Sequence, residues 1–122
     1  MSKNILLVED HDAIRDGIKR IVLRVGHRCE AVANGSLALK AYANKAPDLI
    51  LMDYQMPEMN GIDATIEIRT LEKKQGLQPV PIIGITANAE AGPACIQAGM
   101  NDILCKPFSR SELAAVLSRH FR

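Results

Sequence analysis

Short apolar runs recur along the chain and alternate with segments of helical periodicity. In the two clearest runs, Ile5–Val8 and Leu49–Met52, every position is apolar. A continuous apolar run is typical of a strand covered on both faces, as in a parallel sheet, whereas a strand with one solvent face alternates apolar and polar positions. Weaker runs at 28–32, 80–85 and 103–105 complete a set of five predicted strands.

Five further segments have the spacing of amphipathic helices. In the clearest one, apolar residues recur at i, i+4, i+7, i+8 and i+11 from Ile14 to Val25, and the helix is predicted to end near Gly26. The other helices are expected at about 35–45, 61–74, 88–98 and 109–121. Strands that alternate with helices predict right-handed crossovers and a parallel sheet with helices on both faces, which is a doubly wound α/β fold.

The length and the charge of the chain limit its size class and its partners. A chain of 122 residues fits a single domain, residues 1–122, and is long enough to bury a core without disulfides or structural metal. Fifteen Lys and Arg residues nearly balance fourteen Asp and Glu residues, which leaves a formal net charge of +1. Because no overall field attracts polyanions, we expect no direct nucleic acid binding and no membrane contact by this segment.

The cysteines and the N-terminal residues indicate in which cellular compartment the protein is expected. Cys29, Cys95 and Cys105 are odd in number and lack metal-ligand spacing, so we expect three free thiols. No segment resembles a signal peptide, and no apolar run approaches the roughly 20 residues that span a bilayer. We therefore expect a cytoplasmic location.

Polar residues follow four of the predicted strands directly. Glu9 and Asp10 follow the first run, Asp53 the third, Thr86 the fourth and Lys106 the fifth. In an open parallel sheet, ligands bind at the carboxyl ends of the strands, near a point where the strand order reverses. We therefore expect three carboxylates, a hydroxyl and an ammonium group to converge on one small pocket.

This set of residues suits a metal-assisted phosphoryl transfer. Two like charges about 4 Å apart repel by about 4 kcal/mol at an effective dielectric constant near 20, and a hard cation such as Mg2+ relieves that repulsion. A carboxylate can attack a phosphoryl group to form an acyl phosphate while the metal offsets the charge. Lys106 supplies a cation and Thr86 a hydroxyl for the phosphoryl oxygens. The Lys106–Pro107 bond is a candidate cis peptide.

Each of these residues also has an ordinary structural explanation. Glu9 and Asp10 are favourable next to the positive end of a helix dipole, and Asp53 can cap a strand end. A threonine such as Thr86 is common in strands, and a lysine such as Lys106 is usually a solvated surface charge. These separate explanations would have to place all of the residues at one sheet edge by coincidence, so we favour the converging site.

The segments around these residues resemble the response-regulator receiver family of two-component signalling. They span the chain in this order: Val8–Asp10, Met52–Gly61, Ile85–Ala87 and Cys105–Phe108. The resemblance implies a flavodoxin-like fold, with a five-stranded parallel sheet of order 2-1-3-4-5 and five helices.

The resemblance also assigns a role to each site residue. It implies that Asp53 is the phosphoacceptor and that Thr86 and Lys106 bind the phosphoryl group. It implies further that Mg2+ is held by Asp53 and by three more groups: Glu9, Asp10 and the backbone carbonyl of Gln55.

The implied function is that of a signalling module and not of a metabolic enzyme. Such a module accepts a phosphoryl group from a phosphohistidine, on a histidine kinase or a histidine phosphotransfer domain, and relays the signal by a conformational change or by onward transfer. The pattern of Met52–Gly61 and the long loop before Pro79 look more like receivers of hybrid histidine kinases. Both a stand-alone relay and a part of a larger hybrid kinase remain open.

Two other functions compete with this interpretation. A phosphatase of the haloacid dehalogenase type also forms an aspartyl phosphate, but it carries a second acid where this chain has Gln55. Such enzymes also add a cap domain, for which 122 residues leave little room. A receiver-shaped interaction module that is not regulated by phosphorylation usually lacks one of the acidic or lysine positions, and all of them are present here.

Ile103 departs from the pattern of the family. Many receivers have Tyr or Phe three positions before the lysine, and that ring swings inward when the threonine moves. We therefore expect a smaller rearrangement of the loops after the fourth and fifth strands. Gln55 and Asn88 occupy the positions that set the lifetime of the acyl phosphate in similar proteins, and neither side chain is a strong base.

Overall fold

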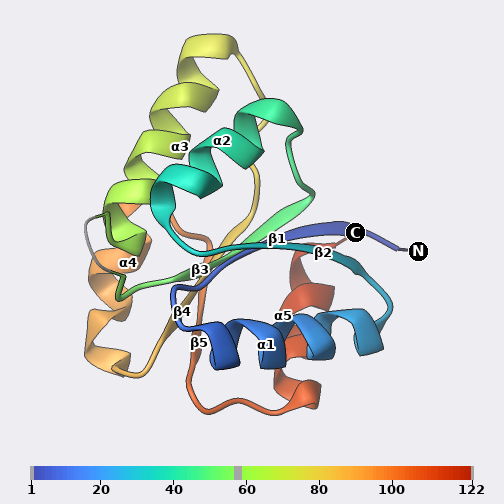
Figure 1. The fold of residues 1–122 in the computed structure, drawn as a ribbon. Coiled ribbons are helices and arrows are strands. Elements are labelled where there is room, and N and C mark those ends of the chain that lie inside the picture. Colours follow the sequence, from blue (N-terminus) through green and yellow to red (C-terminus); the bar gives the residue numbers. More distant parts are fainter. Residues whose placement is uncertain (1, 57–58, 122) are drawn as a thin grey trace.

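The computed structural model describes residues 2–56 and 59–121 and is built around a parallel sheet (Figure 1). The sheet has five strands in the order β2-β1-β3-β4-β5, which confirms the predicted topology. In chain order the strands are β1 (Asn4–Val8), β2 (Arg28–Val32), β3 (Leu49–Asp53), β4 (Ile82–Thr86) and β5 (Asp102–Cys105). Because β1 pairs with both β2 and β3, the chain reverses its winding direction between β1 and β3.

Helices cover both faces of the sheet, as Figure 1 shows. The helices α1 (Asp12–Val25) and α5 (Arg110–His120) pack on one face, where a core cluster includes Ile18 and Leu113. The opposite face carries the other three helices: α2 (Gly35–Asn44), α3 (Gly61–Gln75) and α4 (Gly92–Ala98). The sheet therefore separates two apolar layers, as expected for a doubly wound fold.

The burial of the strands explains their composition. Every residue of β3 and β4 is buried, and so are Ile5–Val8 of β1. The strand β2 lies at the edge of the sheet and exposes Arg28 and Glu30. Continuous apolar runs therefore mark the buried strands β1, β3 and β4, while the edge strand β2 mixes exposed and half-buried positions.

Side-chain caps fix the starts of the helices. The side chain of the N-cap residue accepts a hydrogen bond from a backbone N–H of the first turn in each of α1, α2, α3 and α5, and these caps are His11, Asn34, Asn60 and Ser109. At α5, Glu112 returns a hydrogen bond to the Ser109 N–H and completes a capping box. In these four helices, the polar residue before the first turn therefore sets where the helix begins, whereas α4 follows Ala91 and has no side-chain cap.

Two predicted boundaries were wrong. The strand β4 begins at Ile82 and not at Val80, because the Val80 N–H donates to the Glu72 carboxylate (2.7 Å) and Pro81 has no N–H to donate. The helix expected at 88–98 is split into a 3-10 turn (Ala89–Ala91) and α4. Pro93 explains the split, since its ring would clash with a carbonyl of the preceding turn inside a longer α-helix.

The structure also bears on the predictions about membrane-spanning segments and cysteines. Within residues 2–56 and 59–121, none of the helices combines the length and the apolar character needed to cross a membrane. The three cysteines, Cys29, Cys95 and Cys105, are free thiols.

Candidate functional site

Three carboxylates meet at the carboxyl ends of β1 and β3, where the winding direction reverses. One oxygen from each of Glu9, Asp10 and Asp53 lies within 4.8 Å of the others. Glu9 and Asp53 are only 1% and 4% exposed, whereas Asp10 is exposed. The structure thus brings the three predicted acids together in a cluster that is open to solvent on the Asp10 side.

Backbone pairing continues past the strand ends and fixes the two buried acids. The Glu9 N–H donates to the Val32 carbonyl (3.1 Å), and the N–H of Tyr54, next to Asp53, donates to the Ile85 carbonyl (2.9 Å). These bonds extend the sheet ladder by one residue on β1 and on β3. The two carboxylates are therefore held by the sheet and not by a free loop.

Lys106 reaches the buried acids from the end of β5. Its ammonium group donates to Glu9 Oε1 at 2.9 Å and to Asp53 Oδ1 at 3.5 Å. The backbone N–H of Lys106 donates to the Thr86 carbonyl (2.8 Å). This hydrogen bond keeps the backbone of the fifth strand aligned with the fourth. The following bond, Lys106–Pro107, is cis, as predicted.

Burial and charge shift the protonation of the site. Burial, followed by the negative charge of Glu9, raises the pKa of Asp53 to about 7, although the ammonium group of Lys106 opposes the shift. Burial lowers the pKa of Lys106, but its hydrogen bond to Glu9 and the charge of Asp53 outweigh that effect and leave the pKa above its ordinary value. The positive charge of Lys106 thus does not fully balance the negative charge of the acidic cluster near neutral pH.

The donor set suits a hard divalent cation. All of the clustered side-chain donors are carboxylate oxygens, which Mg2+ prefers over nitrogen and sulfur ligands. Gln55, whose backbone carbonyl is the fourth predicted ligand, lines an open hollow of about 470 Å3 with Tyr54, Met56 and Asn60. Pro57 and Glu58, which belong to the same motif, lie outside the described residues.

Thr86 lies at the same end of the sheet, but its hydroxyl is directed elsewhere. The residue ends β4 and pairs in register with Cys105. Its hydroxyl donates to the Asn88 carbonyl (3.1 Å) and accepts from the Asn88 N–H (3.0 Å). In this conformation, the loop after β4 is therefore closed on the Thr86 side chain.

Two neighbours of the acids were missed by the sequence analysis. Arg15 donates from Nη1 to the Glu9 carbonyl (3.0 Å) and pairs with Asp12 one turn earlier on α1. The backbone N–H of His11 donates to Glu9 Oε2 (3.1 Å). The spacing of Asp12 and Arg15, i and i+3 at the start of a helix, was the available signal for the ion pair. The contacts with Glu9 left no signal in the sequence.

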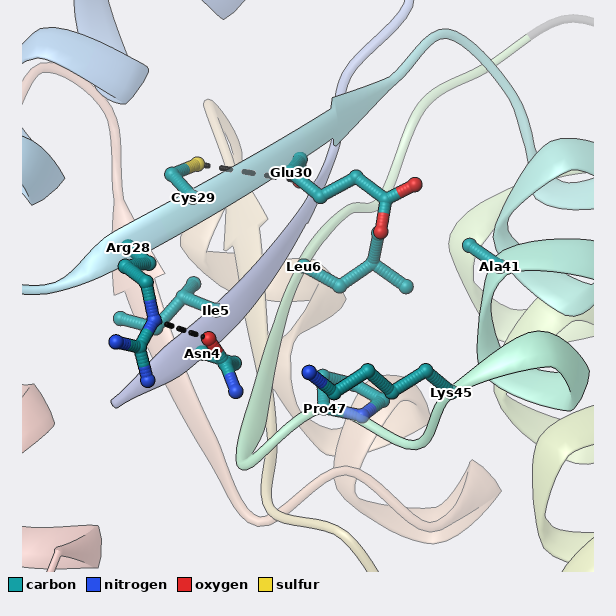
Figure 2. A pocket seen from close by; sticks show the side chains of 9 residues that line it. All are labelled: Asn4, Ile5, Leu6, Arg28, Cys29, Glu30, Ala41, Lys45 and Pro47. Atoms are coloured by element: carbon teal, nitrogen blue, oxygen red, sulfur yellow. Dashed lines mark hydrogen bonds between the residues drawn. The ribbon is translucent and has the colours of Figure 1, made fainter. Parts of the chain in front are cut away.

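A separate pocket of about 230 Å3 opens at the amino ends of β1 and β2 (Figure 2). There Arg28 Nε donates to Asn4 Oδ1 at 2.6 Å. The wall also includes Glu30 on β2 and Lys45, just after α2. Because this pocket lies at the opposite ends of the parallel strands, it is not part of the acidic cluster.

Comparison with known proteins identifies the family. A family model described as the response regulator receiver domain matches residues 5–118. The chain belongs to the response regulator receiver domain family. Receiver domains are signalling modules of two-component systems and not metabolic enzymes. The matched residues include all of the predicted site residues, from Glu9 to Lys106.

Several relatives are receiver domains within much longer kinases. The chain is 39% identical over 115 residues to the sensor histidine kinase GacS of Pseudomonas protegens. The matched region covers 93% of this chain but only 12% of GacS. It is 36% identical over 129 residues to hybrid signal transduction histidine kinase B of Dictyostelium discoideum, covering 97% of this chain and 7% of that kinase. The chain thus spans a small part of these relatives.

A solved structure matches over nearly the whole chain. It is the receiver domain of a sensor histidine kinase of Pseudomonas aeruginosa PAO1, crystallised with a magnesium ion coordinated in its active site cleft. The two chains are 42% identical and superpose with a TM-score of 0.87, covering 98% of this chain and 97% of the other.

Proposed function

We propose that this receiver domain, residues 1–122, accepts a phosphoryl group on Asp53 from a phosphohistidine of a histidine kinase or a histidine phosphotransfer domain. The observation that carries the proposal is the acidic cluster, in which Asp53 lies beside Glu9 and Asp10 while Lys106 contacts two of the three acids. Membership of the receiver family supports the same reaction.

We propose that the cluster holds Mg2+ through the side chains of Glu9, Asp10 and Asp53 and the backbone carbonyl of Gln55. The oxygen donor set supports this choice, and so does the magnesium ion in the similar Pseudomonas aeruginosa structure. When bound, the ion supplies positive charge to the transferring phosphoryl oxygens.

The residues of this chain have separate parts in the transfer. An oxygen of Asp53 forms a bond to phosphorus while the bond from phosphorus to the donor imidazole nitrogen breaks, and that nitrogen keeps the electron pair. Lys106 then exchanges its contact with Asp53 Oδ1 for a phosphoryl oxygen, because the ammonium group is already within 3.5 Å of the attacking carboxylate. The reaction changes only this protein and its phosphodonor.

Thr86 connects the phosphoryl group to the surface of the domain. To donate to a phosphoryl oxygen, its hydroxyl must leave the Asn88 backbone, which opens the loop after β4. The side chain of Ile103, which pairs in register with Gly84, contains no ring that could swing inward. We therefore propose a rearrangement limited to the loops after β4 and β5.

The wider context follows from the relatives. Because the matched kinases are much longer than this chain, we propose that the domain acts within a hybrid histidine kinase, or beside one as a stand-alone relay. A cytoplasmic location fits both arrangements and remains the prediction from the sequence.

The decisive experiment is phosphorylation by a small donor. With acetyl phosphate and Mg2+, the wild-type chain is expected to gain one phosphoryl group, detected by intact-protein mass spectrometry. Asp53→Asn should gain none, while Asp63→Asn, which removes an exposed acid on α3, should behave as wild type. Equal labelling of Asp53→Asn and wild type contradicts the assignment, and a wild type that gains no phosphate favours the unregulated interaction module.

A further inference from the structure

Gly61, the first residue of α3, lies directly against the backbone of the phosphoacceptor. A Cβ atom built on Gly61 would overlap the carbonyl oxygen of Asp53 and would lie 3.1 Å from its carbonyl carbon and 3.0 Å from the Tyr54 Cα. These are backbone atoms of the sheet, which cannot rotate away as a side chain can. Only glycine therefore permits the observed approach of α3 to the end of β3.

Hydrogen bonds hold the start of α3 in this position. The Gly61 N–H donates to the Tyr54 carbonyl (3.0 Å), and the Gly61 carbonyl accepts from the buried Thr65 hydroxyl (2.7 Å). The N-cap side chain of Asn60 accepts from the Asp63 N–H (2.9 Å). The first turn of α3 is thus bonded to the residue that follows Asp53.

We propose that Gly61 is a positioning residue for the phosphoacceptor site. Its close contact with residues 53–54 sets where the Asp53 carboxylate and the Gln55 carbonyl lie relative to Glu9 and Asp10. This inference rests on the proposed function, in which two of the four metal ligands come from residues 53–55. A side chain at position 61 displaces those two ligands while the two on the β1 side stay in place, and this weakens Mg2+ binding.

The chain contains a matched control for this substitution. Gly35 is the first residue of α2 and also follows an asparagine cap, Asn34, which accepts from the Leu37 N–H (2.9 Å). The three atoms nearest to a Cβ atom built on Gly35 all belong to the side chain of Met59, namely its sulfur at 2.8 Å, its Cγ at 2.9 Å and its Cβ at 3.2 Å, and none is a backbone atom. That flexible side chain can move aside. Gly35→Ala therefore reports the general effect of alanine at this helix position.

The test measures Mg2+ affinity of the full chain by NMR titration. Gly61→Ala is expected to bind Mg2+ at least about tenfold more weakly than wild type. Mutation of residues that orient metal ligands typically lowers the metal affinity by about 10- to 100-fold. The Tyr54 and Gln55 amide resonances of this variant should also shift before any metal is added. Gly35→Ala should bind within about twofold of wild type, because its contact involves a flexible side chain and not the site backbone.

Two outcomes separate this inference from the proposed function. A folded Gly61→Ala protein with wild-type Mg2+ affinity overturns the positioning role alone. A wild-type chain that binds no Mg2+ overturns both proposals.

A second pair of variants covers the case in which Gly61→Ala does not fold. Asn60→Ala and Asn34→Ala each remove one equivalent cap, at α3 and at α2. Both should lose similar stability toward urea, because each loses one N-cap hydrogen bond. Only Asn60→Ala should weaken Mg2+ binding and lower the rate of phosphorylation by acetyl phosphate at saturating Mg2+. Equal Mg2+ affinities of the two variants overturn the inference.

Discussion

Three influences set the protonation of the Asp53 carboxyl group. Burial and the adjacent Glu9 carboxylate favour its protonated form, while the Lys106 ammonium favours the charged form. The pKa of about 7 shows that the first two influences prevail. A carboxylate that is not fully compensated by its own protein attracts a further cation, and this is what a metal-assisted nucleophile requires.

The raised pKa of Asp53 predicts a pH dependence of stability in the absence of Mg2+. The folded protein keeps the Asp53 proton up to about pH 7, whereas the unfolded chain releases it near the ordinary value of 3.8. The free energy of unfolding should therefore fall as pH rises from about 4 to 7, by on the order of 3 kcal/mol from this group.

The measurement is urea unfolding in EDTA at several pH values. Asp53→Asn should lack this part of the pH dependence and should be more stable than wild type at pH 7 and above. Because all other titratable groups are shared, the difference between the two curves reports Asp53 together with its coupling to Glu9 and Lys106. Parallel curves would show that the folded pKa is close to the unfolded one.

Glu72 shows how one helix of this fold is fixed to its neighbours. Its carboxylate on α3 is 3% exposed and accepts hydrogen bonds from the Tyr42 hydroxyl on α2 (3.0 Å) and from the Val80 N–H before β4 (2.7 Å). It also pairs with Arg69 (2.7 Å) one turn earlier. Burial, together with the bond to Glu72, raises the pKa of Tyr42 to about 12. The carboxylate therefore joins two helices to the start of a central strand.

Removal of the Glu72 carboxylate is expected to destabilise the domain strongly. Glu72→Ala leaves the Val80 N–H and the Tyr42 hydroxyl buried without a partner, which should cost about 3–5 kcal/mol. Glu67→Ala, at an exposed position of the same helix, should change stability by no more than about 0.5 kcal/mol. Urea unfolding of both variants tests this prediction. Similar losses in the two variants would mean that the buried network contributes little.

The phosphoacceptor site exists only in the folded chain. Lys106 and Glu9 are 97 positions apart in sequence and yet lie 2.9 Å apart in the structure. The acids come from the ends of two strands and the ammonium group from a third. A cation that needs the acids from both strand ends binds the folded state alone and therefore stabilises the whole domain.

Mg2+ is accordingly expected to raise the stability of the whole domain. At a concentration 100 times its dissociation constant, the ion should add about 2.7 kcal/mol to the free energy of unfolding, and EDTA should reverse the gain. Asp53→Asn should gain much less, because one of the anionic ligands is lost. Urea unfolding with and without MgCl2, at matched ionic strength, provides the measurement. Equal gains in both proteins would place the ion elsewhere.

Local sequence patterns predicted a parallel sheet and the set of residues at its carboxyl edge, whereas the strand order was implied by the resemblance to the receiver family. Continuous apolar runs such as Ile5–Val8 mark central strands, because a strand buried on both faces tolerates few polar side chains. Parallel strands bring their carboxyl ends to one edge, so the residues that end these runs had to be neighbours. Glu9, Asp53 and Lys106 were therefore predictable from local patterns.

How those neighbours interact depends on the packing of the folded chain. Nothing local in the sequence shows that the Thr86 hydroxyl is held by the Asn88 backbone, that Glu72 takes the N–H of Val80 and delays the start of β4, or that α3 begins against the carbonyl of the phosphoacceptor. Such contacts depend on distances of a few ångströms between segments that sequence patterns place only to within several residues. Packing of the whole chain fixes those distances, and with them the state in which Asp53 meets its ligands.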